Sequence, residues 1–156
     1  MPSNAAFALA QLQLLLANEA IPNVGNTGGL LGSSVAGSLY IALHTASPAD
    51  GAQSVNEAAY PGYARVAIAR AGGSWTFTEG STSAVSVIPA NAANAAQVQF
   101  GLCDAPADEI ETYFSVGVAA SGATEVLVYA ALNTQLQVTQ NIQPTFAPGQ
   151  LNATCN

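Results

Sequence analysis

The chain has 156 residues, of which 50% are hydrophobic and only 7% are charged, and its formal net charge is −7. This length suits one domain built around a single core. A field this negative repels phosphate backbones, so the sequence excludes nucleic acid as a partner. No stretch reaches the roughly 18–20 uninterrupted apolar residues of a membrane-spanning helix, and we therefore expect no membrane partner.

The cationic side chains are unusually few. Arg65 and Arg70 are the only two, and the chain contains no lysine. Average domains carry about 25% charged residues, so most of this surface must consist of small or uncharged polar side chains. Lysine is depleted at protein interfaces because its hydrated, flexible ammonium group is costly to immobilise. The composition therefore favours a protein in permanent contact with other proteins, copies of itself included.

The first residues predict a helix followed by a glycine-rich arm. Residues Asn4 to Ala20 show an amphipathic pattern, with Ser3 or Asn4 as the N-cap and Pro22 as the end. Residues 23–34 are glycine-rich and show no periodicity. This arm is either a flexible connector or a segment that becomes ordered only against a neighbouring subunit.

We expect residues 1–37 to form this separate helix and arm and to anchor the chain to its partners. The interface residues expected there are Phe7, Leu12, Leu16, Val24, Leu30 and Leu31.

From Ser38 onward, short apolar or alternating runs bounded by turn residues predict a β domain over residues 38–156. The expected fold class is mainly β: a single antiparallel, jelly-roll-like β-sandwich with the N-terminal helix and the arm. Hairpin turns are expected at 71–73, 120–123 and 133–134. The expected strands are Ser38–Thr45, Tyr63–Arg70, Ser74–Thr78, Ser83–Ile88, Ala96–Cys103, Tyr113–Ala119, Glu125–Leu132 and Gln135–Gln140, with Gln150–Cys155 as a further one.

The two arginines lie in one expected strand, Tyr63–Arg70. Because strand side chains alternate between faces, Arg65 and Arg70 should point to opposite sides of the sheet and cannot form one catalytic fork. Arg65 is expected to pair with a carboxylate, with Glu57 as the candidate. Arg70 should lie at a strand end beside a turn. Both are interpreted as structural residues.

Catalytic and cofactor-binding patterns are missing from the sequence. His44 is the only histidine and is expected to be a hydrogen-bonded structural group. No serine lies in the Gly-x-Ser-x-Gly pattern of a nucleophile elbow. The glycines of 25–32 lack the Gly-Lys-Ser/Thr ending of a phosphate-binding loop. We therefore predict no catalytic residue, no cofactor and no metal site, and no enzyme activity.

Two further groups of residues leave alternatives open. The segment Asp104–Glu111 holds four carboxylates in eight residues, and it is expected to be a solvated acidic loop, with calcium binding as the alternative. Cys103 and Cys155 cannot form a zinc site alone. Two buried free thiols are favoured for this pair, and one disulfide is the alternative.

Aromatic side chains gather in the first half of the β region. Trp75, with Tyr60 and Tyr63, is expected to fill the core, because such rings pack there with their polar tips at the rim. The alternative is a carbohydrate-binding β domain in which these rings and the acidic segment form the binding surface.

Four segments, in order, resemble a known family of proteins. They are Leu39–Gly51, Asn56–Tyr60, Tyr63–Ala67 and Ser74–Trp75, which read LYIALHTASPADG, NEAAY, YARVA and SW. The series is similar to small virion structural proteins of tailed bacteriophages, often labelled tail-fibre-like, and the resemblance covers residues 38–78. Where that family often has Asp-Pro-Gly, this chain has Ser-Pro-Ala at 47–49.

The resemblance implies a place in a virus particle and no reaction. The function expected on this basis is a non-enzymatic virion protein, preferably a capsid decoration or cement protein on the outer capsid, with the major capsid protein as partner. The alternative is a tail or tail-fibre component with tail proteins as partners.

Overall fold

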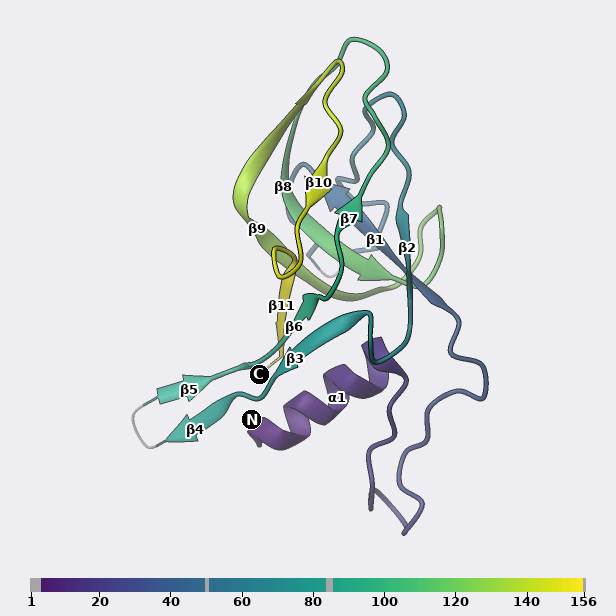
Figure 1. Cartoon of the computed structure of the whole chain (residues 1–156), viewed down its shortest axis with the longest axis vertical. Coiled ribbons are helices and arrows are strands. Elements are labelled where there is room, and N and C mark those ends of the chain that lie inside the picture. Colours follow the sequence, from purple (N-terminus) through teal and green to yellow (C-terminus); the bar gives the residue numbers. More distant parts are fainter. Residues whose placement is uncertain (1–3, 50, 84–85, 156) are drawn as a thin grey trace.

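The computed structural model describes residues 4–49, 51–83 and 86–155, which form one helix and eleven strands (Figure 1). Every strand pairing among them is antiparallel. The elements are α1 (Ala5–Ala17), β1 (Ser38–His44), β2 (Val66–Ala69), β3 (Trp75–Thr78), β4 (Ser81–Ser83), β5 (Ser86–Ile88), β6 (Ala90–Asn94), β7 (Val98–Gln99), β8 (Asp108–Gly117), β9 (Val126–Thr139), β10 (Thr145–Phe146) and β11 (Asn152–Cys155).

Helix α1 is shorter than the sequence suggests. The Asn4 side chain caps it by accepting a hydrogen bond from the Ala6 amide at 2.9 Å. It ends at Ala17 because Asn18 adopts the left-handed conformation, with φ of 61°, before Pro22 is reached. Ser3, the other expected cap, lies outside the described residues. No helix in the described part of the chain is both long and apolar enough to cross a membrane.

The strands form one large sheet and three smaller ones. The large sheet has the order β2-β1-β8-β9, and a second sheet has the order β11-β6-β3. Two further pairs, β10-β7 and β4-β5, complete the β structure. Figure 1 shows the β4–β5 hairpin projecting away from the rest of the molecule. The arrangement confirms the predicted mainly β, sandwich-like fold with an N-terminal helix.

One core joins the helix to the sheets. Leu12 and Leu16 of α1 are buried in the same cluster as Ile41 and Phe114 of the large sheet. In Figure 1, α1 lies against β3 and β6, and the alanines of β6 leave space for the helix to approach closely. The helix is therefore an integral part of the hydrophobic core.

Several expected elements are wrong in detail. The predicted turn at 133–134 lies inside β9, which is a single strand, and the turn at 71–73 connects strands of two different sheets. Part of the expected strand Ser83–Ile88 lies outside the described residues, and the rest belongs to the two strands of the β4–β5 hairpin. Strands β6 and β10 were not predicted. The turn at 120–123 does connect β8 to β9 as expected, with Gly122 at φ of +83°.

Candidate functional site

The lone histidine lies at the centre of a buried polar network. His44 is fully buried, and its Nδ1 is 2.9 Å from the carbonyl oxygen of Val55. A carbonyl only accepts, so Nδ1 carries the proton and Nε2 accepts from the Ser115 hydroxyl at 2.7 Å. Burial lowers the pKa of His44 below its ordinary value of 6.5. The ring is thus held neutral, as a structural group.

Gln53 extends this network across the sheet. Its Nε2 donates to the Tyr40 carbonyl at 2.8 Å and to the Ser115 hydroxyl at 3.2 Å. Gly117 makes this approach possible, because a Cβ atom there would lie 2.2 Å from Gln53 Oε1. A Ser–His hydrogen bond of this kind occurs in hydrolases, but here Ser115 and His44 are both fully buried. No nucleophile is therefore presented to solvent at this pair.

Arg65 is bound on all sides by the protein. Its Nε and one terminal nitrogen donate to the two Glu57 carboxylate oxygens at 2.6 and 2.7 Å, which is a bidentate ion pair. The remaining donors reach the carbonyls of Ala119 and Gly122 and the Thr124 hydroxyl, at 2.7–3.1 Å. The hydrogen bond to Glu57 raises the pKa of Arg65. The predicted Arg65–Glu57 pair is present.

The residues that carry the phage resemblance meet at this pair. Tyr63 donates its hydroxyl to Glu57 at 3.0 Å and accepts from the Leu43 amide at 3.2 Å. Burial raises the pKa of Tyr63, so the hydroxyl stays protonated. Thr124 links the Arg65–Glu57 pair to the His44 network, since its hydroxyl accepts a hydrogen bond from Arg65 and donates one to Gln53. We refer to Glu57, Tyr63 and Arg65 as the buried clamp, because their hydrogen bonds hold residues 51–65 against the large sheet.

Arg70 connects the end of β2 to helix α1 and to the arm. It follows β2 directly and donates to the carbonyls of Leu14 and Leu15 in the last turn of α1 and to the Ser33 hydroxyl. A cation is favourable there because the C-terminus of a helix carries partial negative charge. Arg65 and Arg70 thus contact different regions, as expected, but both lie just outside β2, which spans only Val66–Ala69, so strand alternation does not set their directions. Both cationic side chains of the chain are used internally.

The glycine-rich arm is ordered within the chain itself. Asn18 and Ser33 exchange two hydrogen bonds, at 2.7 and 2.9 Å, and Ile21 and Leu30 form a short antiparallel bridge. Arg70 adds a third attachment through Ser33. These contacts within the chain make the arm more than a flexible connector.

The predicted interface residues divide into two groups. Leu12 and Leu16 are 1% and 0% exposed and pack in the core, so their assignment to an interface is wrong. Phe7, Leu30 and Leu31 are exposed, and Val24 is half-buried. Sequence reasoning missed two further exposed apolar residues of the same region, Leu15 and Val35. We refer to Phe7, Leu15, Leu30, Leu31 and Val35 as the N-terminal apolar residues.

The aromatic rings fill the core, as predicted, and do not form the carbohydrate platform that was the alternative. Trp75 and Tyr60 are both 3% exposed and belong to the core, and Tyr63 is half-buried. The Tyr63 ring stacks on Phe100 at a centroid distance of 6.1 Å, and Tyr60 meets Tyr63 edge-on. These rings cannot form an exposed carbohydrate surface, and the core reading of Trp75 is correct.

The acidic segment is half loop and half strand, because residues 104–107 precede β8 and residues 108–111 begin it. Asp108 begins β8, where it accepts from the Gln137 side chain, and Glu109 accepts from the Ala59 amide. Glu111 is fully buried, and neither of its carboxylate oxygens has a protein partner. Burial, with Glu109 nearby, raises the pKa of Glu111 to about 8. The expectation of a solvated loop therefore holds for Asp104, which is exposed ahead of β8, and is wrong for Glu111.

The described residues contain no cluster of three His, Cys, Asp or Glu side chains arranged to hold a metal ion. Cys103 is a buried free thiol that donates to the Ala105 carbonyl. The side chain of Cys155 lies outside the described part of the structure.

Comparison with known proteins places the chain in a phage family. No curated protein sequence matches it. A family described as "Podophage GP4 fiber I protein gp80" matches residues 32–154, which include β1 to β10 and all but the last residue of β11 and exclude α1 and most of the arm. The match extends far beyond residues 38–78, where the resemblance was found. Because it covers most of the chain, the protein belongs to this family of podophage fibre proteins, represented by the GP4 fiber I protein gp80.

Proposed function

We propose that the chain is a non-enzymatic structural subunit of the phage fibre apparatus, attached to the tail. The observation that carries this proposal is the family match over residues 32–154, since the family is described as a fibre protein. The sequence alone favoured the outer capsid, and the family description favours the tail-fibre alternative instead.

The charge distribution supports a role in protein assembly. Both arginines are occupied by internal acceptors, so the described surface offers no cationic side chain to a phosphate or to an acidic partner.

A capsid decoration role is the second candidate, because an acidic protein with a net charge of −7 would stay outside a shell of packaged DNA.

The N-terminal apolar residues are the proposed attachment surface. Leu31 and Val35 are 74% and 79% exposed, the highest values among the exposed large apolar residues of the described structure. Helix α1 contains no charged residue, and Phe7 and Leu15 remain exposed on it. Apart from Gln11 and Gln13, the helix is apolar on every side, which departs from the expected amphipathic pattern. Such a helix is normally buried, so contact with a neighbouring virion protein would complete its burial.

Two measurements test this function. Gold-labelled antibody against the chain should bind intact particles at the tail; labelling of the capsid alone would support the decoration role and contradict the proposal. In a phage carrying Leu31→Glu and Val35→Glu, the number of copies per particle, measured by quantitative mass spectrometry, should fall. Val118→Glu is the matched control, since Val118 is an exposed apolar residue outside this surface. Unchanged incorporation of the double variant would contradict the attachment surface.

A further inference from the structure

A hydroxyl, an imidazole and a carboxamide meet inside the protein. They belong to Ser115 of β8, His44 of β1 and Gln53 of the segment between β1 and β2, and all three residues are 0% exposed. The Ser115 Oγ atom is 2.7 Å from His44 Nε2 and 3.2 Å from Gln53 Nε2. A hydroxyl bonded to a base is an activated nucleophile, and a carboxamide carries an acyl carbon. The chain therefore holds both reactants of an acyl transfer.

His44 is oriented and protonated as a general base should be. Its Nδ1 donates to the Val55 carbonyl at 2.9 Å, which leaves the lone pair of Nε2 directed at the Ser115 hydroxyl. Burial lowers the pKa of His44, so the ring is neutral and able to accept a proton. The Glu57 carboxylate acts on this pKa in the opposite direction, so its charge favours the imidazolium that forms when the proton is accepted.

The oxygen of the Gln53 amide faces a hydrogen-bond donor. Its Oε1 accepts from the Thr124 hydroxyl at 3.3 Å, and Arg65 donates to Thr124 Oγ1 at 3.1 Å. When a nucleophile attacks an amide carbon, negative charge develops on the amide oxygen. A fixed donor backed by a buried cation stabilises that charge.

The backbone holds Gln53 beside Ser115. The Gln53 amide donates to the Thr124 carbonyl at 2.7 Å, and the side-chain Nε2 donates to the Tyr40 carbonyl at 2.8 Å. Gly117 leaves the space for this side chain, because a Cβ atom there would lie 2.2 Å from Gln53 Oε1. Reactants held in contact in this way avoid the entropic cost of being brought together.

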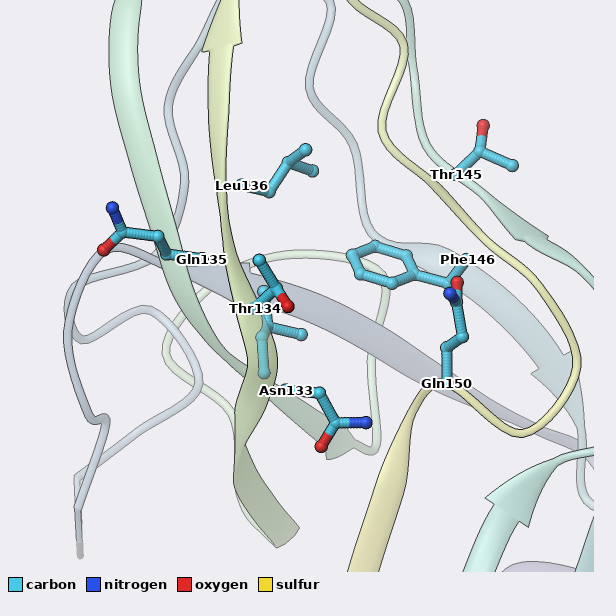
Figure 2. A pocket seen from close by; sticks show the side chains of 8 residues that line it. Asn133, Thr134, Gln135, Leu136, Thr145, Phe146 and Gln150 are labelled. Atoms are coloured by element: carbon cyan, nitrogen blue, oxygen red, sulfur yellow. The ribbon is translucent and has the colours of Figure 1, made fainter.

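A hydroxyl beside a carboxamide is not sufficient for this chemistry. The pocket between β9 and the segment that carries β10 has a volume of about 180 Å³, and both Thr134 and Gln150 line it (Figure 2). No histidine or carboxylate is among its lining residues, and Thr134 is exposed to solvent. That threonine therefore has no base, whereas Ser115 has one.

We propose that Ser115 and Gln53 join in an intramolecular ester crosslink. Rotation of the Gln53 amide about its Cγ–Cδ bond turns the amide carbon toward Ser115 Oγ. The Oγ–Cδ bond then forms while the hydroxyl proton passes to His44 Nε2. The Cδ–Nε2 bond of Gln53 breaks, the nitrogen takes the proton from His44, and ammonia leaves. The products are one ester and one ammonia, so no oxidant, reductant or cofactor is required.

The crosslink would add a covalent bond to the contacts of the buried clamp. Ser115 and Gln53 are 62 residues apart in the sequence, so the ester ties the segment between β1 and β2 to the centre of the large sheet. Burial keeps water from the ester, and the loss of ammonia opposes the reverse reaction. A subunit that bears mechanical load in a fibre gains resistance to unfolding from such a bond.

The test is the intact mass of the full chain, denatured just before measurement, and it does not depend on where the chain lies in the particle. The wild-type mass should fall below that calculated from the sequence by one ammonia, about 17 Da. Peptic digestion should yield one species containing both Gln53 and Ser115, which hydroxylamine separates because it cleaves esters. Full mass, loss of ammonia at other residues, or a Gln53 hydrolysed to a carboxylate would each overturn the proposal.

Variants then assign the roles, in chain made by cell-free translation and sampled over time. Ser115→Ala should keep its full mass, whereas Ser38→Ala, the matched control at an exposed serine of β1, should lose ammonia as the wild type does. Thr124→Val removes the donor to Gln53 Oε1 and should slow the mass loss about a hundredfold. Loss of ammonia at Gln53 in Ser115→Ala would contradict the crosslink even if the wild type shows the lower mass.

Discussion

The Arg65–Glu57 pair offers the sharpest test of the buried clamp. In Arg65→Met the two carboxylate contacts at 2.6 and 2.7 Å are lost, together with the bonds to the carbonyls of Ala119 and Gly122. The Arg65 side chain is 1% exposed and that of Glu57 is 17% exposed. The substitution therefore leaves a carboxylate with little access to water.

The expected magnitude follows from these contacts. Arg65→Met should lower the free energy of unfolding by about 4 kcal/mol, since removing one partner of a buried pair costs roughly 3–5 kcal/mol. Glu57→Gln should cost about 2 kcal/mol, because Arg65 keeps three other acceptors. The double variant should cost little more than Arg65→Met, which gives a coupling energy of about 2 kcal/mol.

The assay is equilibrium unfolding in urea, which does not screen charges as guanidinium chloride does. All four members of the cycle should share one m-value, so that their midpoints report stability alone. Adding salt should leave the coupling nearly unchanged, because a buried pair is weakly screened. Arg70→Met is the control: Arg70 also contacts backbone carbonyls, but it should not couple to Glu57. If the two single effects add to within about 0.5 kcal/mol, the pair does not form the clamp described here.

Three further predictions concern pH dependence and packing. Glu111 is protonated in the folded protein up to about pH 8, so the free energy of unfolding should fall as pH rises from 4.5 to 8. In urea unfolding at a series of pH values, Glu111→Gln should remove this decline. An unchanged dependence of the midpoint on pH would contradict the burial of Glu111. His44 has a lowered pKa, so stability should fall as pH drops below about 6.5, and a His44→Gln variant that keeps this loss would show that another group titrates. Leu12→Ala should lower stability by about 2–5 kcal/mol in thermal or urea unfolding if α1 belongs to the core, whereas a cost below about 1 kcal/mol would mean that the helix is not docked.

The general fold was readable from the sequence because its signals are local. Glycine and proline clusters separate the runs of the β region, and Asn4 gives a recognisable helix start. Arg65 and Arg70 do lie in different environments, but they flank the short strand β2, so the alternation from which this was predicted is not its cause. The Glu57 partner was identifiable because Arg65 lies in an apolar run and a cation buried there needs a carboxylate close in sequence.

Other features depend on tertiary contacts. The Asn133-Thr134 pair has the polarity of a turn, but β8 continues beside it and makes it a bulge. Strand β6 reads Ala-Asn-Ala-Ala-Asn, which has low strand propensity, and it forms where small residues are needed beneath α1.

The His44 network also depends on tertiary contacts and could not be predicted from the sequence. It joins Gln53, Ser115 and Thr124 from three separate segments, so no local spacing reveals it. The one available signal was Ser115 itself, a hydroxyl within the apolar run of β8 that had to find a buried partner.

We propose that the chain is a fibre component whose N-terminal apolar residues contact a neighbouring virion protein. Cryo-electron microscopy of the intact particle tests it most directly. We expect density at the tail into which the β2-β1-β8-β9 sheet and α1 fit, with Leu31 and Val35 covered by another protein chain. Density for this fold on the capsid surface alone, or density at the tail in which these residues face solvent, would contradict it.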